Sequence, residues 1–481
     1  MQISPINDTI PKKSTESICM EITSAWQQFT LTRLRLTQWR GGSYLYRLLR
    51  GSLAPWRRGS WLMQWSEPLG FVLLACVFSF APFVNTALIG LLLLACGAFW
   101  ALLTISDQSI ENFTPIHLLV LLYWGINTVA TAFSPVKAAA FQGWVKLTLY
   151  LVLFAFMARI LRSSRLRSGL ITVYLHIALI VSAYGIRQWI DKVPPLATWN
   201  DPTSTEANVT RAYSYLGNPN LLGGYLLPAI AFSVAALLTW RGWGQRALAL
   251  TMLIANCACL RYTGSRGSWI GFLALMFTLL ILFWYWYKPK MPALWQKWSL
   301  PVALGTVTGV LILAVILLEP LRVRVTSIFV GRGDSSNNFR MNVWMSVIDM
   351  IRDRPILGIG PGNDAFNKVY PLFMRPRYSA LSAYSIPLEI IVETGFIGFT
   401  AFLWLLVTTV NQGIIQLRRL RDQASPEGFW LISAIATLAG MLGHGLVDTV
   451  WYRPQLNTLW WLAIAVIASY YLSPKAQEQQ G

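Results

Sequence analysis

Long apolar runs that recur along most of the chain limit what this sequence can fold into. A helix that crosses a membrane needs about 20 largely apolar residues, and such runs recur from Leu69 to Leu472. Hydrophobic residues make up 55% of the 481 residues and charged residues only 12%. So few charged residues cannot coat a soluble protein of this size. The sequence therefore predicts an all-α polytopic membrane protein.

The apolar runs predict about twelve spans, of which the first and the seventh are short enough to be extended or re-entrant instead. The expected spans cover residues 69–83, 84–105, 115–133, 143–161, 169–189, 220–240, 246–260, 267–287, 299–318, 390–411, 429–449 and 455–472. The chain then divides into an N-terminal segment at 1–68, spans one to nine at 69–318, a large helical loop at 319–386, spans ten to twelve at 387–472 and a tail at 473–481.

The basic residues predict how the chain is oriented in the membrane. Short loops rich in Lys and Arg lie in the cytoplasm, and the connections that carry them here are separated by even numbers of spans. They hold Arg159, Arg162, Arg165, Arg167, Arg241, Arg246, Lys288, Lys290, Lys297, Arg418, Arg419 and Arg421. We expect an inner (plasma) membrane protein with both termini cytoplasmic and the 319–386 loop extracytoplasmic.

The net charge of +19 also raises the question of nucleic-acid binding. The bases are spread between apolar runs and form no soluble basic domain, so we expect membrane lipids as the partner and no nucleic acid. Residues 43–65 mix Trp, Leu and Tyr with Arg. This mixture predicts an interfacial amphipathic helix on the cytoplasmic face, with an ordinary loop as the alternative.

Two arginines beside predicted span starts are the main candidates for an anion site. Arg211 precedes Asn218 and Asn220 at span six, and Arg266 stands at the mouth of span eight. An Arg at a membrane mouth is costly without an anionic partner, and its planar fork suits phosphate or carboxylate. The alternative is that each side chain reaches lipid phosphate.

Two further pairs of polar residues are spaced one helical turn apart. Glu389 and Glu393 begin span ten, where they are expected to pair with loop arginines, carry protons or cap the helix. His444 and Asp448 lie late in span eleven, as a proton relay or as a buried polar contact. Gly358, Gly360 and Gly362 lack the strand and helix of a dinucleotide site and predict a tight turn. No cofactor and no metal set is expected.

These segments, in their order and sidedness, resemble the O-antigen ligase and polymerase superfamily over about residues 205–410. The matching features are Arg211 with Asn-Pro-Asn, Ser-Arg-Gly at 265–267, Arg340 with Trp344, the glycine run ending at Asn363, the stretch from Glu393 to Gly398 and the long late loop. Ligases of that superfamily move a glycan from a polyprenyl diphosphate carrier to an acceptor on the extracytoplasmic face.

The resemblance also implies residue roles. Arg211 and Arg266 take the position of the two diphosphate-binding arginines, and Arg340 joins them as a candidate. Tyr384 falls at the position of a loop histidine that is thought to assist the acceptor. A tyrosine, with its usual pKa near 10, does not accept a proton at neutral pH. This difference argues against ligase activity of the family's kind, whereas the arginines still predict anion binding.

Over its whole length the chain resembles more closely a cyanobacterial family described as bicarbonate transporters and linked to inorganic carbon accumulation. The stretches SYLGNPN, DSSNNFR, GIGPGN, LSAYS and GMLGHGL carry this resemblance. It implies bicarbonate transport. The alternatives are glycosyl transfer of the O-antigen ligase type and an accessory subunit that assists another membrane transporter. The expected ligand is a small anion or a polyprenyl diphosphate-linked glycan.

Overall fold

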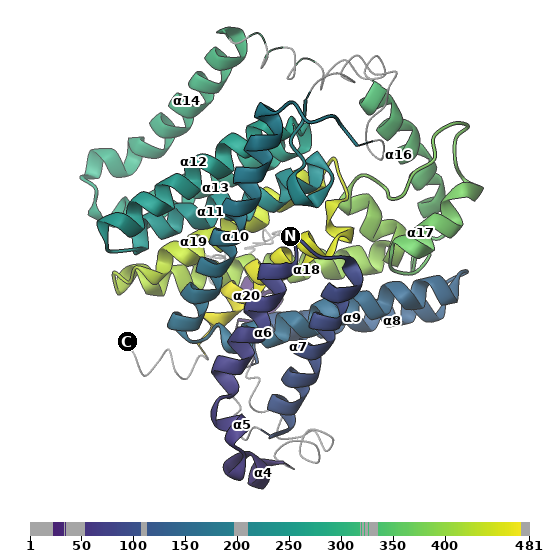
Figure 1. Ribbon diagram of the computed structural model, residues 1–481, viewed down its shortest axis with the longest axis horizontal. Helices are drawn as coiled ribbons and strands as arrows, with labels where there is room; N and C mark the ends of the chain where they lie inside the picture. Colours follow the sequence, from purple (N-terminus) through teal and green to yellow (C-terminus); the bar gives the residue numbers. More distant parts are fainter. Residues whose placement is uncertain are drawn as a thin grey trace, which may run out of the picture.

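The computed structural model describes residues 23–32, 34, 53–106, 113–196, 210–317, 319, 322, 326 and 335–472. Within these ranges the regular elements are all helices (Figure 1). Nine of the described helices are long and apolar enough to cross a membrane. The chain is thus an all-α polytopic membrane protein, and the predicted fold class is confirmed. The tail at 473–481 and most of residues 319–334 lie outside the described residues.

Each predicted span coincides with one helix. The first six helices of this set are α6 (Ser66–Phe80), α7 (Thr86–Ser106), α8 (Pro115–Ala132), α9 (Lys137–Ile160), α10 (Ser164–Ile190) and α11 (Pro219–Thr239). The other six are α12 (Trp243–Thr263), α13 (Arg266–Tyr287), α14 (Ala293–Leu317), α18 (Ile386–Asp422), α19 (Glu427–Gly445) and α20 (Pro454–Ser469). Three of the twelve fall outside the nine. Helices α6 and α20 are only 15 and 16 residues long, and α12, which contains Gln245, Arg246 and Asn256, has too low a mean hydropathy.

Further helices lie before and between these spans. They are α4 (Ala54–Gly59), α5 (Trp61–Gln64), η1 (Ser214–Leu216), η2 (Lys288–Lys290), α16 (Ser335–Asp353), α17 (Asn363–Val369), η4 (Tyr370–Leu372) and η5 (Val450–Tyr452). The single helix predicted at 43–65 is not what the described part forms. Residues 43–52 lie outside the described residues, and α4 is separated from α5 by Ser60, whose backbone is extended.

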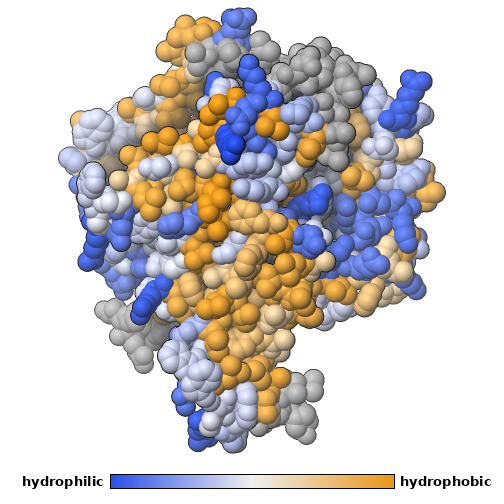
Figure 2. All heavy atoms as spheres, viewed as in Figure 1, coloured by the Kyte–Doolittle hydropathy of each residue, from blue (hydrophilic) through white to orange (hydrophobic). Residues whose placement is uncertain are grey.

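The bundle has two ends with different chemistry. The starts of α11, α13 and α18 and the end of α19 gather at the end that holds Arg211 and Tyr384, which we call the site end. Figure 1 shows α16 and α17 at this end, away from the C-terminus. Hydrophilic residues collect there on the surface, while an apolar band covers the flank formed by α6 and α7 (Figure 2). Such a band suits contact with lipid.

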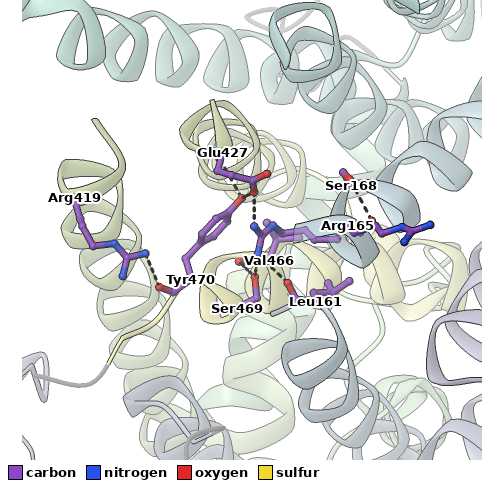
Figure 3. Close-up of polar contacts among 9 residues, drawn as sticks. Leu161, Arg165, Ser168, Arg419, Glu427, Val466, Ser469 and Tyr470 are labelled. Carbon is purple, nitrogen blue, oxygen red and sulfur yellow. Dashed lines mark hydrogen bonds and ion pairs between the residues drawn. The ribbon is translucent and has the colours of Figure 1, made fainter. Parts of the chain in front are cut away.

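The opposite end, which we call the clamp end, is held by a charged cluster (Figure 3). Arg167, at the start of α10, is buried and donates to Glu427, at the start of α19, and to the Leu161 carbonyl at 2.8 Å. The Tyr470 hydroxyl donates to the same Glu427 carboxylate at 2.8 Å, and its ring lies 3.8 Å from the Arg167 guanidinium carbon. One carboxylate thus joins α10, α19 and the end of α20.

The longest helix, α18, runs between the two ends and bends at Gly395. Its backbone there has φ 66° and ψ −174°, a combination that a side chain would strain. A Cβ at this glycine would lie 2.0 Å from the Ile356 carbonyl oxygen, so the glycine also lets the loop approach. The Phe396 N–H donates to the Pro355 carbonyl at 2.8 Å. The bend and the loop therefore hold each other in place.

A segment near the N-terminus packs on the outer flank of α18. Residues 23–29 are helical. The Trp26 indole N–H donates to Asn411 at 2.9 Å, and Trp404 donates to the Phe29 carbonyl at 2.7 Å while stacking on its ring. Part of the segment expected to be a cytoplasmic extension is thus a helix that pairs with the middle of α18.

Candidate functional site

Two helix starts bring the predicted arginines to one corner of the site end. Asn218 caps α11 by accepting from the Asn220 N–H at 2.8 Å, and Ser265 caps α13 by accepting from the Ser268 N–H at 3.3 Å. Arg266 is the first residue of α13. The Arg211 Nε donates at 2.8 Å to the carbonyl of Thr263, which precedes Arg266 by three residues. Arg211 therefore binds the end of α12, and Arg266 follows the α12–α13 turn. Both lie beside helix N-termini, which favour anions.

Asn220 links this corner to the end of α19. Its side-chain oxygen accepts from Arg211 Nη2 at 3.2 Å, and its amide nitrogen donates to Asp448 Oδ2 at 2.7 Å. Asp448 is only 6% exposed. The expectation that His444 and Asp448 share one helix is wrong, because α19 ends at Gly445 and Asp448 follows in the turn toward η5.

Tyr384 lies next to Asp448 on the loop that leads into α18. Its backbone is left-handed, with φ 50°, which is unusual for a residue with a side chain and occurs mainly at functional or strained positions. The next residue, Ser385, donates its N–H to the Thr449 hydroxyl at 2.9 Å. Desolvation by burial raises the pKa of Tyr384 to about 12, and the charge of Asp448 adds to that rise. The phenol is therefore neutral and available as a hydrogen-bond donor at ordinary pH.

Arg340 on α16 lies close enough to the same phenol for its charge to act on it. Its Nη1 donates to Ser336 at 2.9 Å, and its charge acts against the rise in the pKa of Tyr384. The neighbouring Phe339 packs edge-on against the Tyr384 ring, with ring centroids 5.4 Å apart. The late loop thus contributes a third arginine to the group formed by Arg211, Asn220, Asp448 and Tyr384.

The two glutamates, predicted to pair with loop arginines, to carry protons or to cap the helix, accept hydrogen bonds from backbone N–H groups of the loop. Glu389 accepts from the Ala383 N–H at 2.5 Å, one residue before Tyr384. Glu393 accepts from the Gly362 N–H at 2.8 Å, and its own carbonyl accepts from the Gly360 N–H at 2.8 Å. Their observed role is to position the loop.

The glycine run forms the tight turn that the sequence predicts, and the turn is packed on α9. Gly358, Gly360 and Gly362 all have positive φ. A Cβ on Gly143 of α9 would lie 1.9 Å from the Pro361 carbonyl oxygen, so the turn and the helix touch through backbone. The Asn363 side chain donates to the Leu381 carbonyl, which ties the turn to the loop before Tyr384.

His444 lies between the starts of α11 and α13. It is fully buried, and neither ring nitrogen has a hydrogen-bond partner among the described residues. Cβ atoms built on Gly224 of α11 and Gly267 of α13 would approach its ring to 3.1 and 2.8 Å. The glycines on these two helices therefore make room for the imidazole beneath the Arg266 corner.

Three polar residues that the sequence argument did not select also shape the site. Gln188 accepts from the backbone N–H groups of Tyr213 at 3.2 Å and Ser214 at 2.7 Å, which fixes the segment after Arg211. Ser134 donates to the Ile359 carbonyl at 2.6 Å, and Thr449 holds Ser385. A lone amide or hydroxyl at the end of an apolar run is a weak signal, because most such groups bond within their own helix.

The fold and site define a polytopic helical membrane protein with a basic, partly buried group at one end. Residues 247–403 match the family model described as O-Antigen ligase. The match starts within α12 and ends within α18, and it contains Arg266, Arg340, Tyr384 and both glutamates. It supports the superfamily resemblance. The comparison with curated proteins finds no match. No group of three or more His, Cys, Asp or Glu side chains suited to a metal occurs in the described part of the chain.

Proposed function

We propose that the site end binds the diphosphate of a polyprenyl-linked glycan and transfers the glycan to an acceptor, as O-antigen ligases do. The observation that carries this proposal is the hydrogen-bonded series from Arg211 through Asn220 to Asp448, beside Tyr384. A diphosphate has several charged oxygens, and guanidinium groups bind such oxygens with strong, charge-assisted hydrogen bonds. The N-termini of α11 and α13 add to the favourable field.

Asp448 is the group we assign to proton transfer. Tyr384 has too high a pKa to act as a base, whereas a carboxylate can take the proton of an acceptor hydroxyl. As that proton moves to Asp448, the acceptor oxygen bonds to the anomeric carbon. The bond from this carbon to the phosphate oxygen breaks, and polyprenyl diphosphate leaves with the electron pair. Arg211, Arg266 and Arg340 stabilise the leaving diphosphate, and Tyr384 donates a hydrogen bond to the acceptor or donor sugar.

The test compares Arg266→Ala with Arg261→Ala in cells that lack the native gene. Arg261 is exposed on the last turn of α12, five residues from Arg266, so it controls for the loss of one positive charge in the same turn. We expect Arg266→Ala to abolish glycan modification while Arg261→Ala preserves it, at equal protein levels. An unchanged glycan profile in the full deletion would remove the proposal.

Bicarbonate transport is the second candidate function. A buried polar cluster in the middle of the bundle favours it, since transporters bind substrate near the midplane. Ser182 donates to Asn256 at 2.7 Å, and Asn256 donates to Ser233 at 3.4 Å, all three fully buried. The test is uptake of labelled bicarbonate into liposomes that contain the purified protein. Flux no greater than that of empty liposomes would exclude unaided transport.

The same uptake assay addresses the accessory-subunit alternative. Such a subunit should co-purify with another membrane protein and should permit bicarbonate flux only together with it.

We propose the same orientation for glycan transfer and for bicarbonate transport. The 319–386 loop lies outside the cytoplasm, both termini lie inside it, and the protein lies in the inner membrane. Cysteine accessibility at Arg375→Cys in the loop, compared with Arg418→Cys at the end of α18, tests that orientation.

A further inference from the structure

A row of polar side chains runs along one face of α18 toward the clamp end, away from the proposed glycan site. Its members are Thr408, Gln412, Gln416 and Arg419, spaced by four, four and three residues. At about 100° per residue, these positions fall within an arc of about 80° on the helix surface. We call this row the α18 polar row.

Three members of the polar row are buried, Arg419 is partly buried, and many of their polar atoms lack a partner. The exposed fractions of Thr408, Gln412 and Gln416 are 0, 3 and 1%. No hydrogen bond within the described residues satisfies Thr408 Oγ1, Gln412 Nε2, Gln416 Nε2 and Oε1, or Arg419 Nε and Nη1. Leaving a buried polar group unpaired costs about 1–3 kcal/mol. We therefore expect the row to bind water or a ligand that supplies the missing hydrogen bonds.

The surroundings of the row enclose it within protein. Arg419 Nη2 donates to the Tyr470 carbonyl, at the end of α20, at 3.2 Å (Figure 3). A Cβ on Gly413 would lie 3.0 Å from Ile435 of α19 and 3.4 Å from Ile467 of α20. On the adjacent face, Asn411 is bonded to the helix at 23–29. A lipid acyl chain lying against α18 would thus not reach these atoms.

The unpaired atoms favour a negatively charged ligand. Nitrogen donors dominate: two on Arg419, one on Gln412 and one on Gln416, against one carbonyl oxygen and one hydroxyl. The nearby carboxylates are already engaged, since Glu427 accepts from Arg167 and Tyr470 and Asp422 pairs with Arg421. Arg419 has no ion-pair partner within the described ranges. A partly buried positive charge without a counter-ion favours a bound anion.

We propose that Arg419 and Gln416 form a binding site for a small oxyanion at the clamp end of the bundle. Ordered water continues from it to Gln412 and Thr408. An oxyanion supplies several acceptors at once, which matches an amide and a guanidinium one helical turn apart. This site lies at the other end of α18 from the proposed glycan site and does not depend on it.

The experiment uses the full-length protein in phosphatidylcholine nanodiscs, with inorganic phosphate and sulfate as probes in chloride buffer of constant ionic strength. Thermal unfolding is followed at increasing probe concentration. We expect a saturable rise in Tm. Arg419→Gln and Gln416→Leu should weaken the apparent affinity at least about tenfold. Gln416→Leu leaves the Tyr470 bond in place, so it reports on the site even if Arg419→Gln unfolds. Arg418→Gln, at the exposed neighbour, should bind as the wild type does.

A lipid phosphate group is a second source of the same chemistry, so nanodiscs that contain phosphatidylglycerol are examined by native mass spectrometry. A lipid retained by the wild type and by Arg418→Gln, but lost from Arg419→Gln, identifies the occupant as a lipid headgroup. A phosphate- or sulfate-dependent rise in Tm identifies a free anion. The absence of both effects, or an equal loss in Arg418→Gln, would overturn the proposal.

Discussion

The side-chain amide of Asn220 donates a 2.7 Å hydrogen bond to Asp448, across 228 residues of sequence. This contact fixes the start of α11 against the turn that follows α19, and it places the carboxylate beside Tyr384. Asn220 also accepts from Arg211. The amide thus accepts from the Arg211 guanidinium and donates to the Asp448 carboxylate at the same time, which an apolar side chain of similar size cannot do.

Asp448→Asn should separate chemistry from structure. The asparagine oxygen still accepts from Asn220, so we expect Tm to change little while glycan transfer falls by about 10²–10⁴-fold, the usual loss for a general base. Transfer is measured with purified protein and a polyprenyl diphosphate-linked donor. Asp422→Asn at the exposed end of α18 serves as the matched control. Full activity in Asp448→Asn would show that another group takes the proton.

Tyr384→His should add a pH dependence that the native protein lacks. The pKa of Tyr384 is raised to about 12, so the phenol stays protonated and neutral between pH 5 and 9 and contributes no inflection there. A histidine has an ordinary pKa near 6.5 and becomes a proton acceptor above that value. Activity of the variant should therefore rise with pH through that region. Tyr384→Phe, measured over the same pH range, should show no such rise.

Gly143→Ala should displace the glycine turn from α9. The added Cβ would lie 1.9 Å from the Pro361 carbonyl oxygen, and backbone cannot yield as a flexible side chain does. Overpacking of this kind costs about 1–3 kcal/mol or more. We expect a lower Tm together with weaker donor binding, because the same turn positions Glu393. Gly125→Ala on α8, where nothing lies within 4 Å, should leave both quantities unchanged.

Glu427→Gln should weaken the clamp end. The Arg167 and Glu427 side chains are 4 and 27% exposed, and removing one charge of a largely buried pair costs about 3–5 kcal/mol. The exposed Arg187–Asp191 pair on α10, at 76 and 52% exposure, is the control. There Asp191→Asn should cost no more than about 1 kcal/mol. Equal falls in Tm for the two variants would contradict this assignment.

The length of the apolar runs was enough to predict the helices. In lipid, a run of about 20 residues has few ways to pair its backbone N–H and C=O groups other than as a helix. It was enough even for α12, where Arg246 and Arg261 sit near the two ends. The tight glycine turn was predictable for a similar local reason, since Gly360 and Gly362 permit a backbone that other residues disfavour.

Contacts between segments far apart in the chain could not be predicted from the sequence. Asp448 was expected on the same helix as His444, yet the chain leaves the helix at Gly445 and turns the carboxylate toward Asn220. Helical spacing carries no information about where a helix ends when neither glycine nor proline follows. Glu393 was expected to pair with a loop arginine, carry a proton or cap the helix, and it binds a backbone N–H that the folded glycine turn presents.

The bend in α18 has a mechanical consequence. Backbone hydrogen bonds from Phe396 to Pro355 and from Gly360 to Glu393 brace the bend on both sides. The bend is therefore a rigid connection and not a hinge. Beyond it, residues 396–422 form a straight arm of about 40 Å at 1.5 Å per residue. A change of only 5° in the direction of this arm would displace the C-terminal end of α18 by about 3.5 Å over that length. If the glycine turn moves, the fixed bend carries the arm with it, and the displacement is largest near Arg419. Labels near Arg419 and on a neighbouring helix would report it as a change in distance.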